Sequence, residues 1–529
     1  MVFYNLLIIV LLCANAFCKQ PWERSKNALK DKIESELLED SNLLAHVRTS
    51  KEINDEKTKI FWDELAIKFL KEKIAKKLNT NVAKNVILFL GDGMSIPTIT
   101  ATRVYLGGEE KQLSFEHFPY TALSKTYCVD HQTADSACSV TAYLGGVKAN
   151  LGTIGVTAAV EQQNCSAMNE LKNHVNSIAT LFQKKNKWTG LVTTTRVTHA
   201  SPAGVYAHTA YRHWESDSDV LDSHLNPKVC VDIATQLILG KTGQNLHVIL
   251  GGGRKKFIPK YSSDEEGRPG DRSDEINLIS EWIGQKAEMG VKSEYVSNRS
   301  QLLKVKNDTE YLLGLFANNH MQYNLDRDNT TEPSLQEMTE AAIKLLKKGP
   351  NGYFLFVEGG KIDKGHHATT PRKALDETAE FSKAIQKAVE MTDEEDTLIV
   401  VTADHSHTMS FSGHAKRGTD VFGYAGIADD NNFYTILSYA NGPGFRHGKK
   451  NKNRYVPSIH KLNDKDTKWP ATAPLHSETH GADDVSIYAR GPWAHLFAGV
   501  LEQNIIPHIM ATAACVSNDF ICDNDVKMA

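Results

Sequence analysis

The sequence predicts an α/β fold, a three-layer α/β/α sandwich around a mainly parallel central sheet, and three observations support it. Short apolar, strand-like segments alternate with helical patterns along most of the chain. Polar side chains follow directly after several of these segments. In a parallel sheet, ligands bind beyond the carboxyl ends of the strands, which is where such side chains would lie. Residues 412–476 break the alternation with many Gly, Asn, Lys and Pro residues, which indicates an inserted subdomain at the rim of the site.

The strands are expected in short apolar runs and the helices in longer amphipathic patterns between them. The expected strands are residues 86–90, 190–194, 247–250, 353–357, 397–401 and 485–488. The clearest helical patterns cover 334–347 and 374–390. This order places helices on both faces of the sheet. A second polar stretch, residues 258–275, is expected to be a surface loop.

The size and charge of the chain narrow the possible functions. With 529 residues, 41% of them hydrophobic, the chain can bury a large core, either as one domain with insertions or as two domains. Its formal net charge of −4 argues against the capture of nucleic acid by broad electrostatic attraction.

Residues 1–18 have the pattern of a cleaved secretory signal peptide. An apolar core from Leu6 to Leu12 precedes the small residues Ala14 and Ala16. The alternative, an uncleaved anchor, is disfavoured because the apolar run is short for a bilayer span of about 20 residues. No other segment is expected to cross a membrane, and the polar C-terminal end lacks the apolar tail of a lipid-anchor signal. We therefore expect a secreted, soluble, extracellular protein.

Sequons and cysteines also fit secretion. Four Asn-x-Ser/Thr sequons are candidate glycosylation sites: Asn164, Asn298, Asn307 and Asn329. Six cysteines remain after removal of the signal: Cys128, Cys138, Cys165, Cys230, Cys515 and Cys522. An even number in an oxidising compartment indicates disulfides, among the 15 connectivities that six cysteines allow. The alternative is that some of them are ordinary buried thiols.

Residues 19–80 are expected to form a charged helical N-terminal extension. Apolar residues recur there at roughly helical spacing, at Phe61, Leu65, Phe69, Ile74 and Leu78. The extension is either a solvated helix or a helix that packs on a partner subunit. The neighbouring aromatic residues Phe61 and Trp62 are compatible with the second interpretation.

Carboxylate, imidazole and hydroxyl groups are concentrated after the strand-like segments, as expected for a cluster of divalent metal ions. They are Asp92, His199, Ser201, Glu358, Asp363, His367, Asp404, His405 and His480. Zinc binds histidine nitrogen and carboxylate oxygen, whereas magnesium prefers oxygen ligands. The expected ligand sets are Asp363, His367 and His480 for one zinc ion, Asp92, Asp404 and His405 for a second, and Asp92, Ser201 and Glu358 for magnesium.

The expected nucleophile is Ser136 in the segment TADSACSVTAYLGG. Small residues and a helical pattern follow it, so Ser136 is expected near a helix N-terminus, where an anion is favoured. The alternative is that Asp135 and Ser136 only cap this helix, but the metal ligands favour catalysis. Arg212 is expected to bind phosphate oxygens through parallel N–H groups. Three nearby histidines are expected to support the ligands rather than bind the ions: His213, His366 and His407.

These motifs together resemble the alkaline phosphatase family, in its animal branch, over nearly the whole chain from about Asn81 to Cys522. The matching strings are NVILFLGDGM, DSA, AYLGGVKAN, TTTRVTHASPAGVYAH, DIATQLI, VILGGGRK, EGGKIDKGHH, VTADHSHTMSF and ETHGADDV. The resemblance implies a homodimeric metalloenzyme that hydrolyses phosphate monoesters to an alcohol and inorganic phosphate through a phosphoserine. It also implies a catalytic domain over 81–411 and 477–522, a crown-like subdomain over 412–476 at the dimer interface, and an N-terminal helix that embraces the neighbouring subunit.

The resemblance also implies roles for individual residues. Ser136 would be the nucleophile, Arg212 the phosphate clamp, and the three ligand sets would hold two zinc ions and one magnesium ion per subunit, with His199 just behind the magnesium ligands. By motif position, the expected disulfides are Cys165 with Cys230 and Cys515 with Cys522, which leaves Cys128 with Cys138 as a third pair.

Two departures from the family pattern concern the metals. Lys364 stands where vertebrate members usually have His and bacterial members Lys, while His199 follows the vertebrate pattern. Vertebrate members also bind calcium at a carboxylate-rich site, whose GLFE stretch reads GLFAN here. Ala317 replaces the acid, so calcium is not expected, although Glu332 remains nearby.

Three other functions are disfavoured by the sequence. A sulfatase of the same architecture would have a Cys/Ser-x-Pro-x-Arg signature, which is absent at Ser136. A phosphodiesterase would not be expected to combine Arg212 with a complete third metal set. A secreted protein that only sequesters phosphate compounds would be expected to have lost the nucleophile or a ligand.

Overall fold

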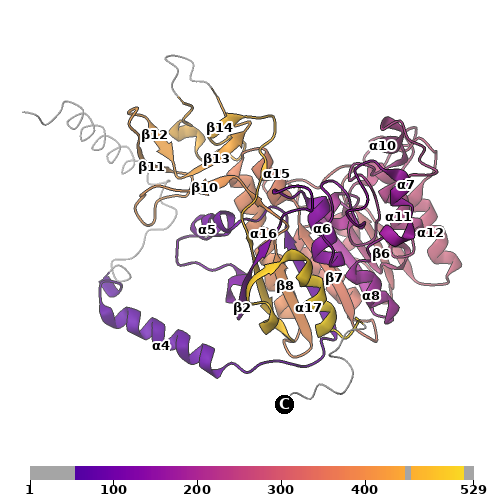
Figure 1. The fold of residues 1–529 in the computed structure, drawn as a ribbon, viewed down its shortest axis with the longest axis horizontal. Coiled ribbons are helices and arrows are strands. Elements are labelled where there is room, and N and C mark those ends of the chain that lie inside the picture. The colour runs from indigo at the N-terminus through magenta and orange to yellow at the C-terminus, as the bar shows by residue number, and fades with distance from the viewer. Residues whose placement is uncertain (1–53, 447–453, 518–529) are drawn as a thin grey trace, which may run out of the picture.

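The structure is a computed structural model that describes residues 54–446 and 454–517 (Figure 1). The expected signal peptide, residues 19–53 of the N-terminal extension and Cys522 lie outside the described residues. Within the described part of the chain, no helix is both long and apolar enough to cross a membrane.

A ten-stranded sheet forms the centre of the fold, and it contains all six strands expected from the sequence. In spatial order its strands are β17 (Gly499–Glu502), β2 (Tyr120–Lys125), β16 (Val485–Arg490), β8 (Thr397–Thr402), β1 (Asn85–Gly91), β7 (Tyr353–Gly359), β3 (Trp188–Arg196), β4 (Val248–Gly252), β6 (Tyr311–Leu315) and β5 (Ser293–Val296). Strand β16 is antiparallel to both of its neighbours, and the other pairings in the sheet are parallel.

The side chains of the central strands alternate between two hydrophobic cores, one on each face of the sheet. In β1, Val86, Leu88 and Leu90 pack in one core, and Ile87 and Phe89 pack in the other. All five are fully buried, which explains why the strand is a continuous apolar run in the sequence. The change Phe89→Ala would cost about 3–5 kcal/mol of stability, because it removes buried apolar surface and leaves a cavity.

Helices cover both faces of the sheet and complete three layers (Figure 1). The first core packs against α6 (Ser136–Gly145), α8 (Ile178–Lys184), α11 (Ile233–Leu239), α12 (Leu278–Glu288) and α17 (Ile506–Ala513). The second core packs against α5 (Ile96–Tyr105), α14 (Leu335–Leu346) and α16 (Pro371–Met391). Shorter helices are α7 (Cys165–Met168), α9 (Ala200–Ala203), α10 (Asp217–Asp222), α13 (Arg299–Leu302) and α15 (Lys361–His367).

The inserted segment has its own sheets and its own apolar cluster. Its strands β13 (Leu437–Gly442) and β14 (Ala471–Pro474) form a three-stranded sheet with β10 (Met409–Phe411), which directly precedes the insertion. Its strands β11 (Tyr424–Ile427) and β12 (Phe433–Thr435) form a two-stranded sheet. Phe422, Leu437 and Trp469 are buried here together with Val104 of α5 and Leu375 of α16. The insertion therefore packs on helices of the second layer.

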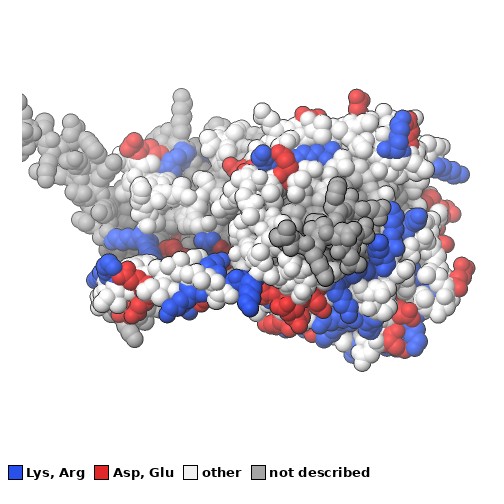
Figure 2. Space-filling model, turned by 60° about the horizontal axis from the view of Figure 1, so that its bottom comes forward, with Lys and Arg blue, Asp and Glu red and all other residues white. Residues whose placement is uncertain are grey.

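Helix α4 (Lys59–Ala75) belongs to the expected N-terminal extension and projects away from the body of the molecule (Figure 1). None of its residues is buried, and Figure 2 shows basic, acidic and uncharged surface along it. Its apolar side chains are 50–81% exposed at Ile60, Trp62, Leu65, Ile67, Phe69, Leu70 and Ile74. Leu78, which fits the helical spacing, lies after the helix. An exposed apolar surface of this kind is typical of a contact with a partner.

The loop over 258–275 is mostly exposed, as expected, but buried arginines anchor it. Arg272 is 1% exposed and pairs with Asp232 at 3.1 Å. Arg254, also 1% exposed, pairs with Glu265 and Glu266 at 2.9 and 2.7 Å. The hydrophilic composition of the loop therefore did not reveal that the charged side chains of Arg272 and Asp264 are buried.

Candidate active site

Four adjacent strands bring the expected site residues to one edge of the sheet. Strands β8, β1, β7 and β3 are neighbours and run in parallel, so their carboxyl ends lie together. Asp92 follows β1, Glu358 is the last residue but one of β7, and Asp404 follows β8. Ser201 lies in α9, just after β3. All four side chains are fully buried, so the predicted convergence is present in the structure.

Asp92, Asp404 and Glu358 form a buried group of carboxylates. Burial, followed by the charge of Asp404, raises the pKa of Asp92 well above its ordinary value. Burial also raises the pKa of Glu358 to about 7, although Thr193 and Thr195 donate hydrogen bonds to its Oε2. Both oxygens of Asp92 and the Oε1 of Glu358 have no hydrogen-bond partner among the described residues. Buried carboxylate oxygens of this kind suit cation binding, because a cation offsets their repulsion.

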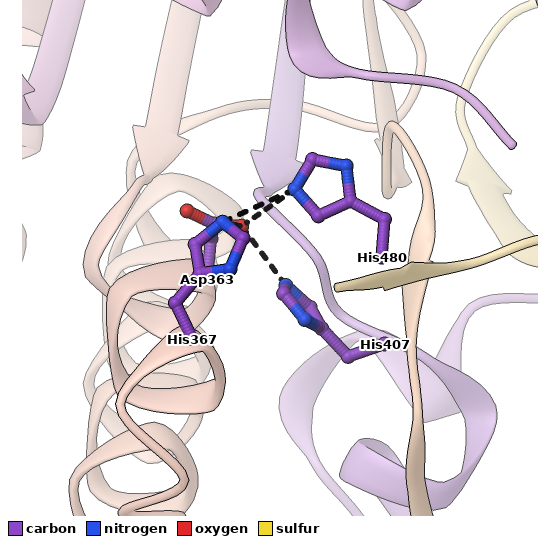
Figure 3. Close-up of side chains that lie close together, drawn as sticks. All are labelled: Asp363, His367, His407 and His480. Carbon is purple, nitrogen blue, oxygen red and sulfur yellow. Dashed lines mark hydrogen bonds and ion pairs between the residues drawn. The ribbon is translucent and has the colours of Figure 1, made fainter. Parts of the chain in front are cut away.

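A second group joins one carboxylate to three imidazoles (Figure 3). The Oδ1 of Asp363 lies 3.1 Å from Nε2 of His367, 3.3 Å from Nε2 of His480 and 2.9 Å from Nε2 of His407. Asp363 and His367 are four residues apart on α15 and therefore share one face of that helix. Burial opposes the ionisation of Asp363, but the charges of His367 and Lys364 lower its pKa well below the ordinary value.

The outer nitrogens of two histidines in this group are held by backbone carbonyls. His367 Nδ1 donates to the carbonyl oxygen of Glu478 at 2.5 Å, and His480 Nδ1 donates to that of Ala134 at 2.8 Å. Because a carbonyl only accepts, these bonds place a proton on Nδ1, so each ring in its neutral form turns the lone pair of Nε2 toward Asp363. In that form both imidazoles could bind a metal ion through Nε2.

His407 has a different role from the other imidazoles in the group. Its Nδ1 lies 2.6 Å from the buried carboxylate of Glu478 and its Nε2 2.9 Å from Asp363. Although burial opposes the charge, Glu478 raises the pKa of His407 to about 9. A doubly protonated imidazole has no lone pair for a metal ion, so His407 orients Asp363. Sequence reasoning missed Glu478, whose only signal is its place two residues before His480.

Two further groups of potential ligands share Asp92. One contains Asp92, Asp363 and His405, and the other contains Asp92, His199 and Glu358. His405 Nε2 also lies 3.2 Å from Asp404 Oδ2, and burial lowers the pKa of His405 well below its ordinary value. A neutral imidazole between carboxylates can donate a lone pair to a metal ion.

Ser136 is the first residue of α6 and is 1% exposed. Its Oγ lies 3.2 Å from Nε2 of His405. The cap of the helix is Asp135, whose Oδ1 accepts from the backbone N–H of Cys138 at 3.0 Å. The capping interpretation therefore applies to Asp135, and the Ser136 hydroxyl faces the metal-capable groups.

Arg212 lies beside the nucleophile. Its Nη1 is 2.8 Å from Oδ2 of Asp135, and its Nη2 is 3.5 Å from Nε2 of His199. The Asp135 side chain is 13% exposed, and its partial burial opposes the charge, yet Arg212 lowers its pKa, so the pair is ionic. Burial, followed by the charges of Lys364 and Arg212, lowers the pKa of His199 well below its ordinary value, so His199 stays neutral beside these cations.

The remaining expected residues lie around this centre. Lys364 Nζ is 3.0 Å from Oδ2 of Asp363. His366 is hydrogen-bonded to Thr98 at 2.9 Å, and His213 packs edge-on against Tyr211. Neither His366 nor His213 belongs to a metal-capable group of the described residues.

Two of the expected disulfides are present, Cys128–Cys138 and Cys165–Cys230. Cys515 is also disulfide-bonded, while its expected partner Cys522 lies outside the described residues. Of the four sequons, Asn164, Asn307 and Asn329 are exposed. Asn298 is half-buried and caps α13.

Comparisons with known proteins agree with this geometry. The family model for alkaline phosphatase matches residues 83–516. A membrane-bound alkaline phosphatase of Bombyx mori is 47% identical over 442 residues, which cover 82% of this chain and 80% of that protein. The tissue-nonspecific isozyme of alkaline phosphatase from Homo sapiens is 44% identical over 479 residues, covering 87% and 89%. The solved structure of Thermus thermophilus alkaline phosphatase has a TM-score of 0.59 and 21% identity, over 83% of this chain and 93% of that one.

The solved structures share the fold, and the curated relatives share nearly half of their residues over most of both chains. The alkaline phosphatase family is metal-dependent, in keeping with the groups of carboxylates and imidazoles at the sheet edge. This chain therefore belongs to the alkaline phosphatase family and is a phosphomonoesterase.

Proposed function

We propose that the chain hydrolyses small phosphate monoesters through a phosphoserine at Ser136, with two zinc ions and one magnesium ion bound per chain. The observation that carries this proposal is the position of the Ser136 hydroxyl. It lies at the start of α6, between the Arg212–Asp135 pair and the imidazole of His405.

The residues at the site fit these ions. Asp92 and Glu358 offer buried oxygens that have no hydrogen-bond partner among the described residues, and His367 and His480 present oriented lone pairs. The proposed ligands are Asp363, His367 and His480 for one zinc ion, Asp92, Asp404 and His405 for the other, and Asp92, Ser201 and Glu358 for magnesium. When bound, the ions supply positive charge that favours ionised oxygens around the reacting phosphorus. Calcium is not expected, because Ala317 offers no side-chain oxygen.

The side chains of this protein then perform the following steps. Arg212 binds two oxygens of the phosphoryl group through its N–H groups, and Asp135 holds it in place. Ser136 gives up its hydroxyl proton and its Oγ forms a bond to phosphorus, while the bond from phosphorus to the ester oxygen breaks. The ester oxygen takes up one proton in return and leaves as the alcohol. Water next attacks the phosphoserine, which releases inorganic phosphate and restores the hydroxyl. The N-terminus of α6 favours negative charge on Oγ as it attacks phosphorus and again as it is released.

A substrate panel tests the activity. Purified protein should cleave a chromogenic phosphate monoester and leave the matching diester and sulfate ester intact, and chelation should abolish the reaction. Preferential cleavage of the diester or the sulfate ester would support the phosphodiesterase or sulfatase alternative instead. Binding of the monoester without turnover would support a sequestering protein.

Two variants test the proposed roles at the site. Ser136→Ala should remove the phosphoenzyme trapped by acid quenching and nearly all turnover, with zinc content unchanged. Arg212→Ala should raise the inhibition constant of inorganic phosphate and should also leave zinc bound. Wild-type turnover in the first variant, or loss of zinc in the second, would contradict the assignment.

We also propose that the chain is secreted and glycosylated. The exposed sequons and the disulfides support this proposal. Expression in a eukaryotic secretory host should release protein that begins after residue 18 and loses mass on treatment with a glycan-removing enzyme. Retention in the cell with an intact N-terminus would contradict it.

We further propose a homodimer in which α4 and the crown-like subdomain over 412–476 contact the partner. The exposed apolar side chains of α4 support this. Native mass spectrometry should give twice the mass of one chain, and deletion of residues 54–80 should shift the population toward monomer. A truncated protein that stays fully dimeric would exclude a role for α4.

A further inference from the structure

The disulfide Cys128–Cys138 joins an irregular loop to the helix of the nucleophile. The chain has no helix or strand between the end of β2 at Lys125 and the start of α6 at Ser136. Val129, Asp130, His131 and Gln132 in this loop are exposed, whereas both cysteines are 2% exposed. The bridge spans a sequence separation of 10 and ends two residues after Ser136.

Three successive residues inside this disulfide-closed loop each contact a different part of the proposed site. The carbonyl of Ala134 accepts from His480 Nδ1 at 2.8 Å, which orients a metal ligand. The carboxylate of Asp135 lies 2.8 Å from Arg212, the proposed phosphate clamp. The third residue is Ser136 itself. A displacement of the loop would therefore move the nucleophile and the partners of both the clamp and a ligand together.

Few other bonds hold the exposed part of the loop. Val129 N–H donates to the carbonyl of Ala149 at 3.0 Å, and Asp130 accepts from the N–H of Leu151 at 2.9 Å. Beyond these, the loop closes on itself through Cys128 N–H, which donates to the carbonyl of His131 at 3.1 Å. Asp135 also accepts from the N–H of Gly152 at 3.1 Å. The disulfide is the covalent link that ties the start of this loop to α6, two residues after Ser136.

We propose that the Cys128–Cys138 disulfide is a positioning element of the active site, which fixes Ala134, Asp135 and Ser136 relative to His480 and Arg212. This inference rests on the proposed function. It extends that function, because it assigns an effect on phosphate affinity, turnover and zinc retention to a disulfide that is not part of the ligand sets. A bridge that served only global stability would affect none of the three at a temperature where the protein is folded.

The second bridge, Cys165–Cys230, provides a matched control. It packs in an apolar cluster with Trp214 and Val220, and neither of its cysteines bonds to a residue of the proposed site. Its sequence separation is 65, so its removal should cost at least as much stability as removal of the shorter bridge, because a longer loop gains more entropy in the unfolded chain.

The experiment compares the full-length double variants Cys128→Ser/Cys138→Ser and Cys165→Ser/Cys230→Ser with the wild type. All three are supplied with zinc and magnesium and assayed where circular dichroism shows them folded. The measurements are kcat/KM for a chromogenic phosphate monoester, the inhibition constant of inorganic phosphate, and the rate of zinc loss to a chromophoric chelator. If the serine pair at 128 and 138 does not fold, Cys128→Ala/Cys138→Val fills the space of the sulfurs with apolar atoms and takes its place.

Loss of the 128–138 bridge should raise the phosphate inhibition constant and lower kcat/KM, each by about tenfold or more, since small misplacements of reacting groups cost up to about 100-fold. Zinc should also leave faster. The control pair should keep the wild-type values despite its lower melting temperature. Unchanged constants in the first pair, or equal losses in both pairs, would overturn the inference. If the wild type itself cleaved no monoester, the proposed function would fail, whereas phosphate affinity and zinc retention would still report on the bridge.

Discussion

The variant Glu358→Gln measures two effects of the buried carboxylate separately: how much it destabilises the metal-free protein, and how much it contributes to magnesium binding. Burial raises the pKa of Glu358 from its ordinary value of 4.5 to about 7. Because the folded pKa lies above the unfolded one, the metal-free protein loses stability as the pH rises from about 4.5 to about 7. Above about pH 7 the whole of this destabilisation is present. The difference between the folded and the unfolded pKa of Glu358 corresponds to about 3 kcal/mol in the free energy of unfolding. The glutamine oxygen can keep accepting from Thr193 and Thr195, so the variant should regain most of this energy at pH 8.

Scanning calorimetry at pH 8 measures this effect. For a chain of this length, about 3 kcal/mol corresponds to a rise of about 3 °C in the Tm of the metal-stripped variant. Magnesium at about 100 times its Kd should stabilise the stripped wild type by about 3 kcal/mol but should not raise the Tm of the variant, which lacks one of the proposed ligands.

Glu377→Gln is the matched control for this measurement. Burial raises the pKa of Glu377 to about 8, but Glu377 belongs to no metal-capable group of the described residues. Its variant should gain stability when stripped and keep the full response to magnesium. The reasoning would be refuted if stripped Glu358→Gln melted at or below the wild type, or if it responded to magnesium as the wild type does.

Three further variants probe how the site is held. Asp135→Asn should lower the free energy of unfolding by about 2 kcal/mol, because Arg212 loses the charge of its partly buried partner, and it should weaken phosphate inhibition. An unchanged inhibition constant would argue against Asp135 as the anchor of the clamp. Glu478→Gln removes the carboxylate that faces His407 and should weaken zinc binding about 10–100-fold in chelator competition. Excess zinc should restore the activity of this variant. A zinc affinity equal to that of the wild type would contradict the role of Glu478. Gly93→Ala should lower both Tm and activity, because the φ of Gly93 is +69° and the added Cβ would lie 2.4 Å from the His407 ring. A variant as stable and active as the wild type would show that the backbone at this position can shift freely.

The sequence predicted the centre of the fold better than its edges. Val86–Leu90 is a continuous apolar run because both faces of β1 are buried, and such runs are easy to recognise. Strand β2 mixes exposed and buried residues near the edge of the sheet, and only its pairing with β16 and β17 defines it. The burial of Arg272 could not be foreseen either, because its partner Asp232 lies 40 residues away in the chain.

The site was predictable where the chemistry lies in short motifs. Asp92, Glu358 and Asp404 each end an apolar strand, so their convergence follows from parallel pairing. The orientation of the imidazoles was not predictable, because it depends on the Ala134 carbonyl and on Glu478, which only the folded chain brings close. For the same reason, local spacing did not show that His407 contacts both Glu478 and Asp363.

Metal content measured together with turnover tests the central claim, that buried carboxylates and oriented imidazoles hold the ions that make Ser136 reactive. Elemental analysis of the purified enzyme during stepwise chelation should begin at two zinc ions and one magnesium ion per chain, with activity falling as zinc is lost and returning when zinc is restored. Protein that keeps its full activity after every zinc ion has been removed would contradict the account.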